Sequence, residues 1–591
     1  MLSEKQKNIV DSVDSRIVVK ACPGSGKTYS VSARIAKLLQ QGFYKHKGIA
    51  VISFTTVAAE EIKKSLKSDY GIQITYPHFI GTIDSFINQH IFLPFGHLLL
   101  GCTSRPEIVG TEYNQWYDYD ASKRTRHRGR ITYRDPNEYF DKVSFSKDDE
   151  PIPLSPASSY HFSWKELRKN DGEYKKVIND IIEAKWHHFK NGKVNQADAN
   201  YFSLQLLEKH PLILKSLSSK YSHLVIDEAQ DTTDIQMSII DSLDNNGIEN
   251  ILFVGDPDQA IFEWNTADSE LFMQKYNDEK YSTIELEENR RSSEKICSLL
   301  NQVGTIQSVS VADVKDDPNS PEVKGYDSAD EIQQLKNSFI EKCDELGIET
   351  KSRAILFRGK SFGEEHFELI PDNSIDHPWK NKHFYIRDVV QGKFLMEKGE
   401  YKDSLRLLEK GFYKLQNPNL LYISRTYLRN QINQKGFRLY RSELFDFVNL
   451  LPSTENKNLN DWINESNVIL EEKGYNKLQV NGAKASVEIK KLFHRKETSE
   501  DLPYMMGTIH SVKGQTFGAV LLFLRKRATK NYSTILSPTY NEADESKKRK
   551  DQEELRLVYV ACSRPKRLLW IAVPNTDVNT WRNYFGLNRE S

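Results

Sequence analysis

The loop ACPGSGKT at residues 21–28 constrains the fold more than any other feature of the sequence. It follows the apolar run IVVKA and precedes a stretch with helical spacing, TYSVSARIAKLLQQG. A glycine-rich loop between a strand and a helix points successive backbone N–H groups at phosphate oxygens. Lys27 is then expected to reach the β- and γ-phosphates, and the Thr28 hydroxyl to contact Mg²⁺. The loop therefore predicts an α/β domain that binds ATP or GTP. The residues expected to line the nucleotide are Ala21, Cys22, Pro23, Gly24, Ser25, Gly26, Lys27, Thr28 and Tyr29.

A second apolar run supplies the acidic half of such a site. The segment HLVIDEAQD at 223–231 reads as a buried strand that ends in two neighbouring carboxylates. Asp227 is expected to hold Mg²⁺, directly or through water, and Glu228 to activate the attacking water. Together with the glycine-rich loop, the pair predicts nucleotide hydrolysis rather than binding alone.

The order of apolar runs and amphipathic stretches predicts two α/β domains, each interrupted by an insertion. Strand-like runs recur at 49–54, 250–259, 353–358 and 519–524. We interpret RLVYVACSR at 556–564 in the same way, as strands and loops of the second α/β domain, and DVKDDPNSPEVKG at 313–325 as a surface connection. The predicted boundaries are 1–95 and 205–285 for the first domain, 96–204 for its insertion, 286–375 and 500–591 for the second domain, and 376–499 for a helical insertion.

Composition narrows the class of protein. The 82 Lys+Arg balance the 82 Asp+Glu, so the total charge gives no support for a nucleic-acid partner. Local clusters do: KRTRHRGR at 123–130 is expected to contact DNA, LRKRATK at 524–530 forms a second cluster, and KKRK at 547–550 is either a DNA contact or a solvated face. Five cysteines without a CxxC pair exclude a zinc or disulfide framework, and we expect a cytoplasmic protein with no membrane partner. The pair His187–His188 is interpreted as a solvated face.

The order of motifs resembles that of the UvrD/Rep-type superfamily 1 DNA helicases. The resemblance covers both predicted α/β domains, and it implies two RecA-like P-loop motor domains with parallel sheets and mainly helical insertions. The segments that carry it are LSEKQ (2–6), FTTVAAEEIKK (54–64), GTIDSF (81–86), DEAQD (227–231), GDPDQAIFEW (255–264), LEENRRS (286–292), GTIHSVKGQTF (507–517) and EELRLVYVACSRPKR (553–567).

The resemblance also implies roles for single residues. Gln6 would read adenine, and Gln259, Arg291 and Arg564 would contact the γ-phosphate. Arg290 stands where the family usually has a tyrosine that stacks on adenine, and Gln515–Thr516 stand where it usually has Leu-Glu. The residues expected to contact DNA are Phe54, Thr55, Thr82, Phe262, Trp264, Arg358, His510 and Lys513.

Two functions follow from these patterns. The first is an ATP- and Mg²⁺-dependent motor that translocates on single-stranded DNA and unwinds tailed duplexes, with the 3′→5′ polarity that the family implies. The second is a DNA-sensing ATPase switch that regulates a separate nuclease subunit without processive unwinding, as in compact Gabija-type phage defence. The sequence leaves open whether the pathway is DNA repair, replication restart, plasmid transfer or antiviral defence.

Overall fold

The computed structural model describes residues 2–41, 47–109, 143–153, 171–261, 268–367, 384–417, 423, 425–480, 485–493, 503–525, 531–537, 539–543 and 545–587. Of the predicted basic clusters, 123–130 and most of 524–530 lie outside the described residues. Phe262 and Trp264, two of the expected DNA contacts, also lie outside them.

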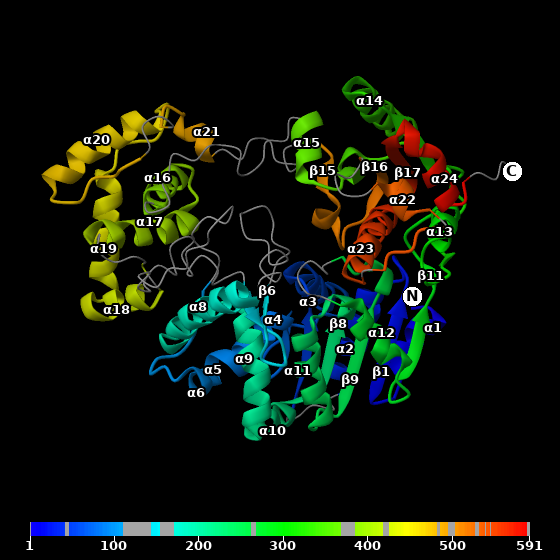
Figure 1. Cartoon of the computed structure of the whole chain (residues 1–591), viewed down its shortest axis with the longest axis horizontal. Coiled ribbons are helices and arrows are strands. Elements are labelled where there is room, and N and C mark those ends of the chain that lie inside the picture. The colour runs from blue at the N-terminus through cyan, green and yellow to red at the C-terminus, as the bar shows by residue number, and fades with distance from the viewer. Residues whose placement is uncertain are drawn as a thin grey trace.

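A six-stranded parallel sheet forms the centre of the first α/β unit (Figure 1). Its strands, in spatial order, are β10 (Ser282–Leu286), β1 (Arg16–Ala21), β9 (Asn250–Gly255), β8 (Tyr221–Asp227), β2 (Gly48–Ser53) and β3 (Phe79–Thr82). Successive side chains of a strand point to opposite faces, so Ile17 and Val19 belong to one core and Val18 to the other. Helices cover both faces because both sets of side chains are apolar.

The helices of the first unit divide between these faces. On one side lie α1 (Glu4–Asp11), α2 (Lys27–Gln40) and α3 (Thr56–Tyr70), which pack in the hydrophobic core that contains Val19. The other side, with the core of Val18, is covered by α4 (Ile83–Ile87), α9 (Gln196–Lys209), α10 (Pro211–Lys220), α11 (Asp234–Asn245) and α12 (Ser269–Asn277). The π-helical turn η1 (Asn88–Phe92) continues from α4 into the short helices α5 (Leu93–Phe95) and α6 (His97–Leu100).

A five-stranded parallel sheet forms the second α/β unit, in the order β13 (Glu322–Tyr326), β17 (Pro565–Pro574), β16 (Phe517–Phe523), β14 (Arg353–Phe357) and β15 (Met505–Thr508). One face packs on α13 (Glu294–Asn301), α22 (Tyr532–Ile535), α23 (Glu545–Cys562) and α24 (Val578–Tyr584). The other packs on α14 (Ala329–Glu345) and α15 (Lys360–His366). A short ladder of β11 (Glu288–Asn289) and β12 (Val309–Ser310) lies between the units in sequence. The single turns are η4 (Ala229–Asp231), η5 (Pro257–Gln259), η7 (Thr350–Ser352), η9 (Ile509–Val512) and η10 (Asn575–Asp577).

Each insertion has a hydrophobic core of its own. The first contains α8 (Asp171–Lys190) and the short strands β4 (Glu107–Ile108), β5 (Val143–Phe145), β6 (Pro151–Pro153) and β7 (Lys193–Val194). The second is helical and stands apart from the second sheet at the upper left of Figure 1. Its helices are α16 (Phe384–Glu397), α17 (Tyr401–Gln416), α18 (Arg425–Lys435), α19 (Phe437–Leu450), α20 (Leu459–Glu472) and α21 (Ile489–Phe493). The predicted fold class, two RecA-like α/β domains with mainly helical insertions, is confirmed.

Three local predictions are wrong. The run 556–562 belongs to the helix α23 rather than to a strand, because Leu557 to Cys562 are buried all round and an apolar run has no period to reveal a helix. The connection at 313–325 already contains the start of β13. His188 is fully buried in α8, and only the neighbouring His187 is partly exposed.

Candidate functional site

The glycine-rich loop leaves the carboxyl end of β1 and turns directly into α2. The backbone N–H of Cys22 donates to the Leu286 carbonyl at 2.9 Å, which fixes the start of the loop to the neighbouring strand β10. Gly24 and Gly26 have backbone φ values of +74° and +78°, a conformation that residues other than glycine rarely adopt. Cys22 is fully buried and burial raises the pKa of its thiol, so it has the role of a small packing residue.

Close neighbours explain why these two positions are glycines. A Cβ atom on Gly24 would lie 2.6 Å from the Cβ of Arg291, and one on Gly26 would lie 2.7 Å from Nε2 of Gln6. The loop is therefore packed between the N-terminal helix α1 and the segment that carries Arg291.

The two predicted carboxylates lie at the end of β8, beside the loop. Asp227 pairs with Val254 of β9 in the parallel register, which brings the carboxyl ends of both strands to the same edge. Among the described residues, no other side chain donates a hydrogen bond to either buried carboxylate oxygen of Asp227. Burial and the neighbouring Glu228 raise the pKa of Asp227. A buried, unpartnered carboxylate of this kind is suited to a cation.

Glu228 is held differently. Its backbone is left-handed, with a φ of 56°, and its Oε2 accepts a hydrogen bond from the Gln230 amide at 2.6 Å. Burial opposes ionisation, but Lys27, Lys513, the hydrogen bond from Gln230 and the charge of Arg564 together outweigh it and lower the pKa of Glu228. The ionised form of this side chain is therefore favoured in the pocket.

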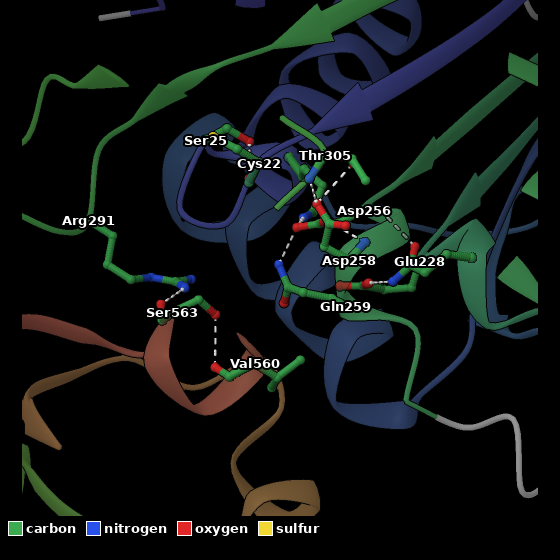
Figure 2. Close-up of polar contacts among 12 residues, drawn as sticks. Cys22, Ser25, Glu228, Asp256, Asp258, Gln259, Arg291, Thr305, Val560 and Ser563 are labelled. Carbon is green, nitrogen blue, oxygen red and sulfur yellow. Dashed lines mark hydrogen bonds and ion pairs between the residues drawn. The ribbon is translucent and has the colours of Figure 1, made fainter. Parts of the chain in front are cut away.

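Asp256, for which the sequence predicts no role, lies beside Lys27. It follows β9 directly, and its carboxylate lies 3.5 Å from Nζ of Lys27. The Gln259 amide also donates to it, as Figure 2 shows. The sequence signal that could have identified Asp256 is a carboxylate at the end of a buried strand, the same signal that identified Asp227.

Two arginines reach the site from the second unit. Arg291 donates to the carbonyl of Ser563 at 2.9 Å (Figure 2), and Arg564 donates to Oε1 of Gln259. Burial and the proximity of Arg291 lower the pKa of Arg564 to about 9. The buried guanidinium group of Arg564 and the half-buried one of Arg291 face one pocket and repel each other, and an anion between them would relieve that repulsion.

Most of these residues surround one pocket of about 450 Å³ at the junction of the units, but Asp227 and Asp256 are not among the residues that line it. The predicted residues that line it are Gly24, Ser25, Gly26, Lys27, Thr28, Tyr29, Thr55, Glu228, Gln259, Arg290, Arg291, Lys513 and Arg564. Residues that line it without having been predicted include Val57, Ala58, Glu61, Asp231, Gly514, Thr516 and Lys566. Ala21, Cys22 and Pro23, at the start of the loop, are buried and are not among the residues that line the pocket.

The two residues expected to recognise adenine are engaged with the protein. Gln6 is 2% exposed, and its Nε2 donates to the Ser25 carbonyl at 2.9 Å. Its Oε1 accepts from the backbone of Ser3 and caps α1. Arg290 forms an ion pair with Glu288 at 2.8 Å, while its backbone N–H donates to the Gly24 carbonyl.

Among the described residues that were expected to contact DNA, Arg358 and Lys513 lie close enough to His510 to lower the pKa of its imidazole, after the larger effect of burial. Thr55 caps α3, and Lys513 forms an ion pair with Asp231 at 2.5 Å, so that both line the nucleotide pocket. Thr82 caps α4. The side chains of Phe54 and His510 are half-buried.

Arg358 makes a bidentate ion pair with Glu554 of α23, with N–O distances of 2.7–3.0 Å. Tyr532 also donates to this carboxylate, at 3.4 Å. A DNA phosphate would therefore have to compete with Glu554 for the guanidinium group.

A family model described as UvrD/REP helicase N-terminal domain matches residues 2–280. The match covers every pocket residue that the first α/β unit contributes. Over this part of its length, the chain resembles the UvrD/Rep-like superfamily 1 helicases. The second unit supplies Arg291, Lys513 and Arg564 to the same pocket.

Curated relatives carry similar names. A probable DNA helicase II homolog of Mycoplasma genitalium is 23% identical, over 96% of this chain and 84% of the relative. DNA helicase II of Haemophilus influenzae is 28% identical, over 51% of this chain and 40% of its own length. ATP-dependent DNA helicase PcrA of Bacillus subtilis is 26% identical, over 51% of this chain and 39% of its length. The chain thus spans about two-fifths of the last two proteins. Of the helices that the structure describes, none has both the length and the apolar character needed to cross a membrane.

Proposed function

We propose that this protein is an ATP- and Mg²⁺-dependent motor that translocates on single-stranded DNA and unwinds tailed duplexes in the 3′→5′ direction. The observation that carries the proposal is the pocket itself, in which Lys27 and Glu228 of one α/β unit face Arg291 and Arg564 of the other. Names of relatives such as ATP-dependent DNA helicase PcrA support the same reaction.

The positive side chains fit a triphosphate. Lys27 is held by Asp256 at 3.5 Å, a long ion pair that a phosphate oxygen can replace. Arg291 and Arg564 would then contact the γ-phosphate and stabilise the charge that develops during its transfer. Because these groups belong to different units, ATP favours closure between the units and its loss favours opening.

The acidic side fits a hydrated Mg²⁺. Asp227 offers two buried oxygens without a side-chain donor among the described residues, and Thr28 lines the pocket next to Lys27. A bound Mg²⁺ would neutralise charge on the phosphates. Glu228, held by Gln230 and kept ionised by Lys27 and Lys513, would take the proton of the attacking water.

The ATPase test uses two variants and one matched control. Lys27→Ala and Glu228→Gln should each lower DNA-stimulated turnover by a factor on the order of 10²–10⁴. Lys37→Ala removes a lysine of the same helix that pairs with Asp11 on the surface, and it should leave turnover unchanged. Wild-type turnover in Glu228→Gln would contradict the assigned roles.

The unwinding test uses duplexes with a 3′ or a 5′ single-stranded tail. Displacement of the 3′-tailed duplex alone supports a 3′→5′ motor, and displacement of the 5′-tailed duplex alone overturns that polarity. Strong DNA-stimulated ATPase without displacement of either duplex would replace the motor with the DNA-sensing switch. Co-purification of a nuclease subunit would add to the case for the switch.

A further inference from the structure

The segment 256–261 belongs to the first unit by sequence but is held by the second. Lys513 donates to the Gln259 carbonyl at 2.8 Å, and Arg556 of α23 donates to the Ala260 carbonyl at 2.9 Å. Ile261 is fully buried in the hydrophobic core of the second unit, with residues of α13 and α23. Movement of the second unit therefore acts directly on this segment.

Asp258 adds a contact whose role the pocket does not explain. One of its carboxylate oxygens, Oδ2, accepts hydrogen bonds from both the backbone N–H and the hydroxyl of Thr305, at 2.7 and 2.9 Å (Figure 2). Thr305 lies in the loop 302–308, which follows α13 of the second unit. The preceding Gly304 packs so closely on α23 that a Cβ atom there would lie 3.0 Å from the ring of Tyr559. Asp258 is only 8% exposed, so the contact crosses between the units in a nearly dry environment.

Asp256 connects this contact with the phosphate pocket. Its carboxylate faces Lys27 on one side and accepts the backbone N–H of Asp258, at 3.1 Å, on the other. The path from Lys27 to Thr305 thus runs through only two carboxylates. A phosphate that draws Lys27 away from Asp256 changes the charge balance at the first of them.

We propose that Asp258 is a positioning residue that ties the loop 302–308 of the second unit to the phosphate-sensing segment 256–261. The inference rests on the proposed function and deepens it. It assigns the coupling between ATP occupancy and the position of the second unit to a residue that does not line the pocket. Without this contact, ATP can still bind and be hydrolysed, but the position of the second unit depends less on whether ATP is bound.

The test compares basal and DNA-stimulated ATPase. Asp258→Ala removes the acceptor, and Thr305→Val removes the hydroxyl donor. For both variants, basal kcat and KM for ATP should stay within about twofold of wild type, while the ratio of DNA-stimulated to basal turnover should fall about tenfold for Asp258→Ala and less for Thr305→Val. Asp258→Asn and Thr305→Ser keep an acceptor and a hydroxyl, so both should retain at least half of the wild-type ratio.

A matched control separates coupling from folding. Asp278→Ala removes an exposed carboxylate that accepts a backbone N–H two residues further on, at 2.9 Å, in a turn of the first unit that does not meet the second. It should leave the stimulation ratio unchanged, and thermal unfolding should show that all variants are folded at the assay temperature.

The outcomes distinguish a failure of the proposed function from a failure of the role of Asp258. If wild-type protein shows no DNA-stimulated ATPase, the proposed function fails. If wild type is stimulated and folded Asp258→Ala is stimulated equally, only the role of Asp258 is overturned. An equal loss of basal and stimulated turnover in both Asp258→Ala and Thr305→Val would likewise overturn it, because that pattern places the tie in the catalytic site.

Discussion

At the scale of single residues, two adjacent carboxylates are driven in opposite directions by their surroundings. Burial and the charge of Glu228 raise the pKa of Asp227, whereas Lys27 and Lys513 lower the pKa of Glu228 despite its burial. The ionised form is therefore disfavoured at Asp227 and favoured at Glu228. This difference supports the proposed roles, in which Asp227 holds the cation and Glu228 is the base.

This arrangement predicts a pH profile that depends on metal. Mg²⁺ binds the ionised form of Asp227, so at limiting Mg²⁺ the ATPase rate should rise with pH, and added Mg²⁺ should move the midpoint to lower pH. A midpoint that does not respond to Mg²⁺ would contradict the role of Asp227. Without Mg²⁺, a raised pKa in the folded state contributes stability that is present below the unfolded value and is lost as pH rises. Urea unfolding with Mg²⁺ omitted should show this loss, and Asp227→Asn should abolish it.

A glycine of the loop gives a second prediction. Gly24→Ala would place a Cβ at 2.6 Å from that of Arg291 and would hold alanine in the left-handed region, which costs about 1–2 kcal/mol before the clash. Both terms act on the contact between the loop and Arg291, so we expect weaker ATP binding and a lower Tm. Gly71→Ala is the matched control, because its φ is +66° and no atom lies within 4 Å of the added Cβ. Equal effects of the two substitutions would show that backbone strain alone is responsible.

At the scale of elements, a buried ion pair fixes the first insertion to α9 of the first α/β unit. Lys185 of α8 contacts Asp198 of α9 at 2.8 Å and donates to the Val143 carbonyl of β5 at 2.6 Å, and Ser144 donates to the same carboxylate. Both charged side chains are at most 1% exposed. A helix, a second helix and a strand that are far apart in sequence are therefore joined by one polar network.

Removing one partner of this network should be costly. Lys185→Ala leaves Asp198 buried without its cation and should lower the free energy of unfolding by about 3–5 kcal/mol. The double variant Lys185→Met with Asp198→Leu should lose less, since no charge remains buried. Lys190→Ala, an exposed lysine of the same helix, is the control. Chemical denaturation checks all three, and a loss from Lys185→Ala no larger than that from the control would show that the network does not stabilise the fold.

The sequence was informative where pattern and chemistry are local. Continuous apolar runs located β1, β2, β8 and β9, and the glycine-rich loop and the carboxylates at the end of β8 located Lys27 and Glu228. It failed where burial comes from tertiary packing: α23 is apolar on all sides near its end, so its sequence looks like a strand. Asp256 and Thr305 are brought to their partners by contacts between segments distant in the chain, which spacing along the sequence does not encode.

At the scale of the whole molecule, zero net charge hides an uneven distribution. Of the basic residues at 547–550, Arg549 pairs with Asp268 at 3.2 Å and Lys547 lies 4.0 Å from Glu542, so part of this cluster is already neutralised. The cluster at 123–130 has five Lys and Arg in eight residues and no acidic residue.

We therefore expect DNA affinity to respond unequally to the two clusters. Reversing the five charges at 123–130 should weaken single-stranded DNA binding and flatten its dependence on salt, because fewer counterions are released. ATP binding should not change. Reversing 547–550 should have a smaller effect. Fluorescence anisotropy across a salt series measures both, and unchanged affinity after the first reversal would assign 123–130 to a solvated surface.

The burial of Ile261 limits how the two α/β units can move relative to each other. Freeing this side chain from the core of the second unit would expose it to water, at about 1.5–3 kcal/mol. If the two units rotate relative to each other during the proposed ATP cycle, a rotation that keeps the Ile261 side chain buried costs the least free energy. A chimera that replaces one α/β unit with that of a relative would need a residue at position 261 that packs into the hydrophobic core of the second unit. This requirement holds however similar the residues of the nucleotide pocket are.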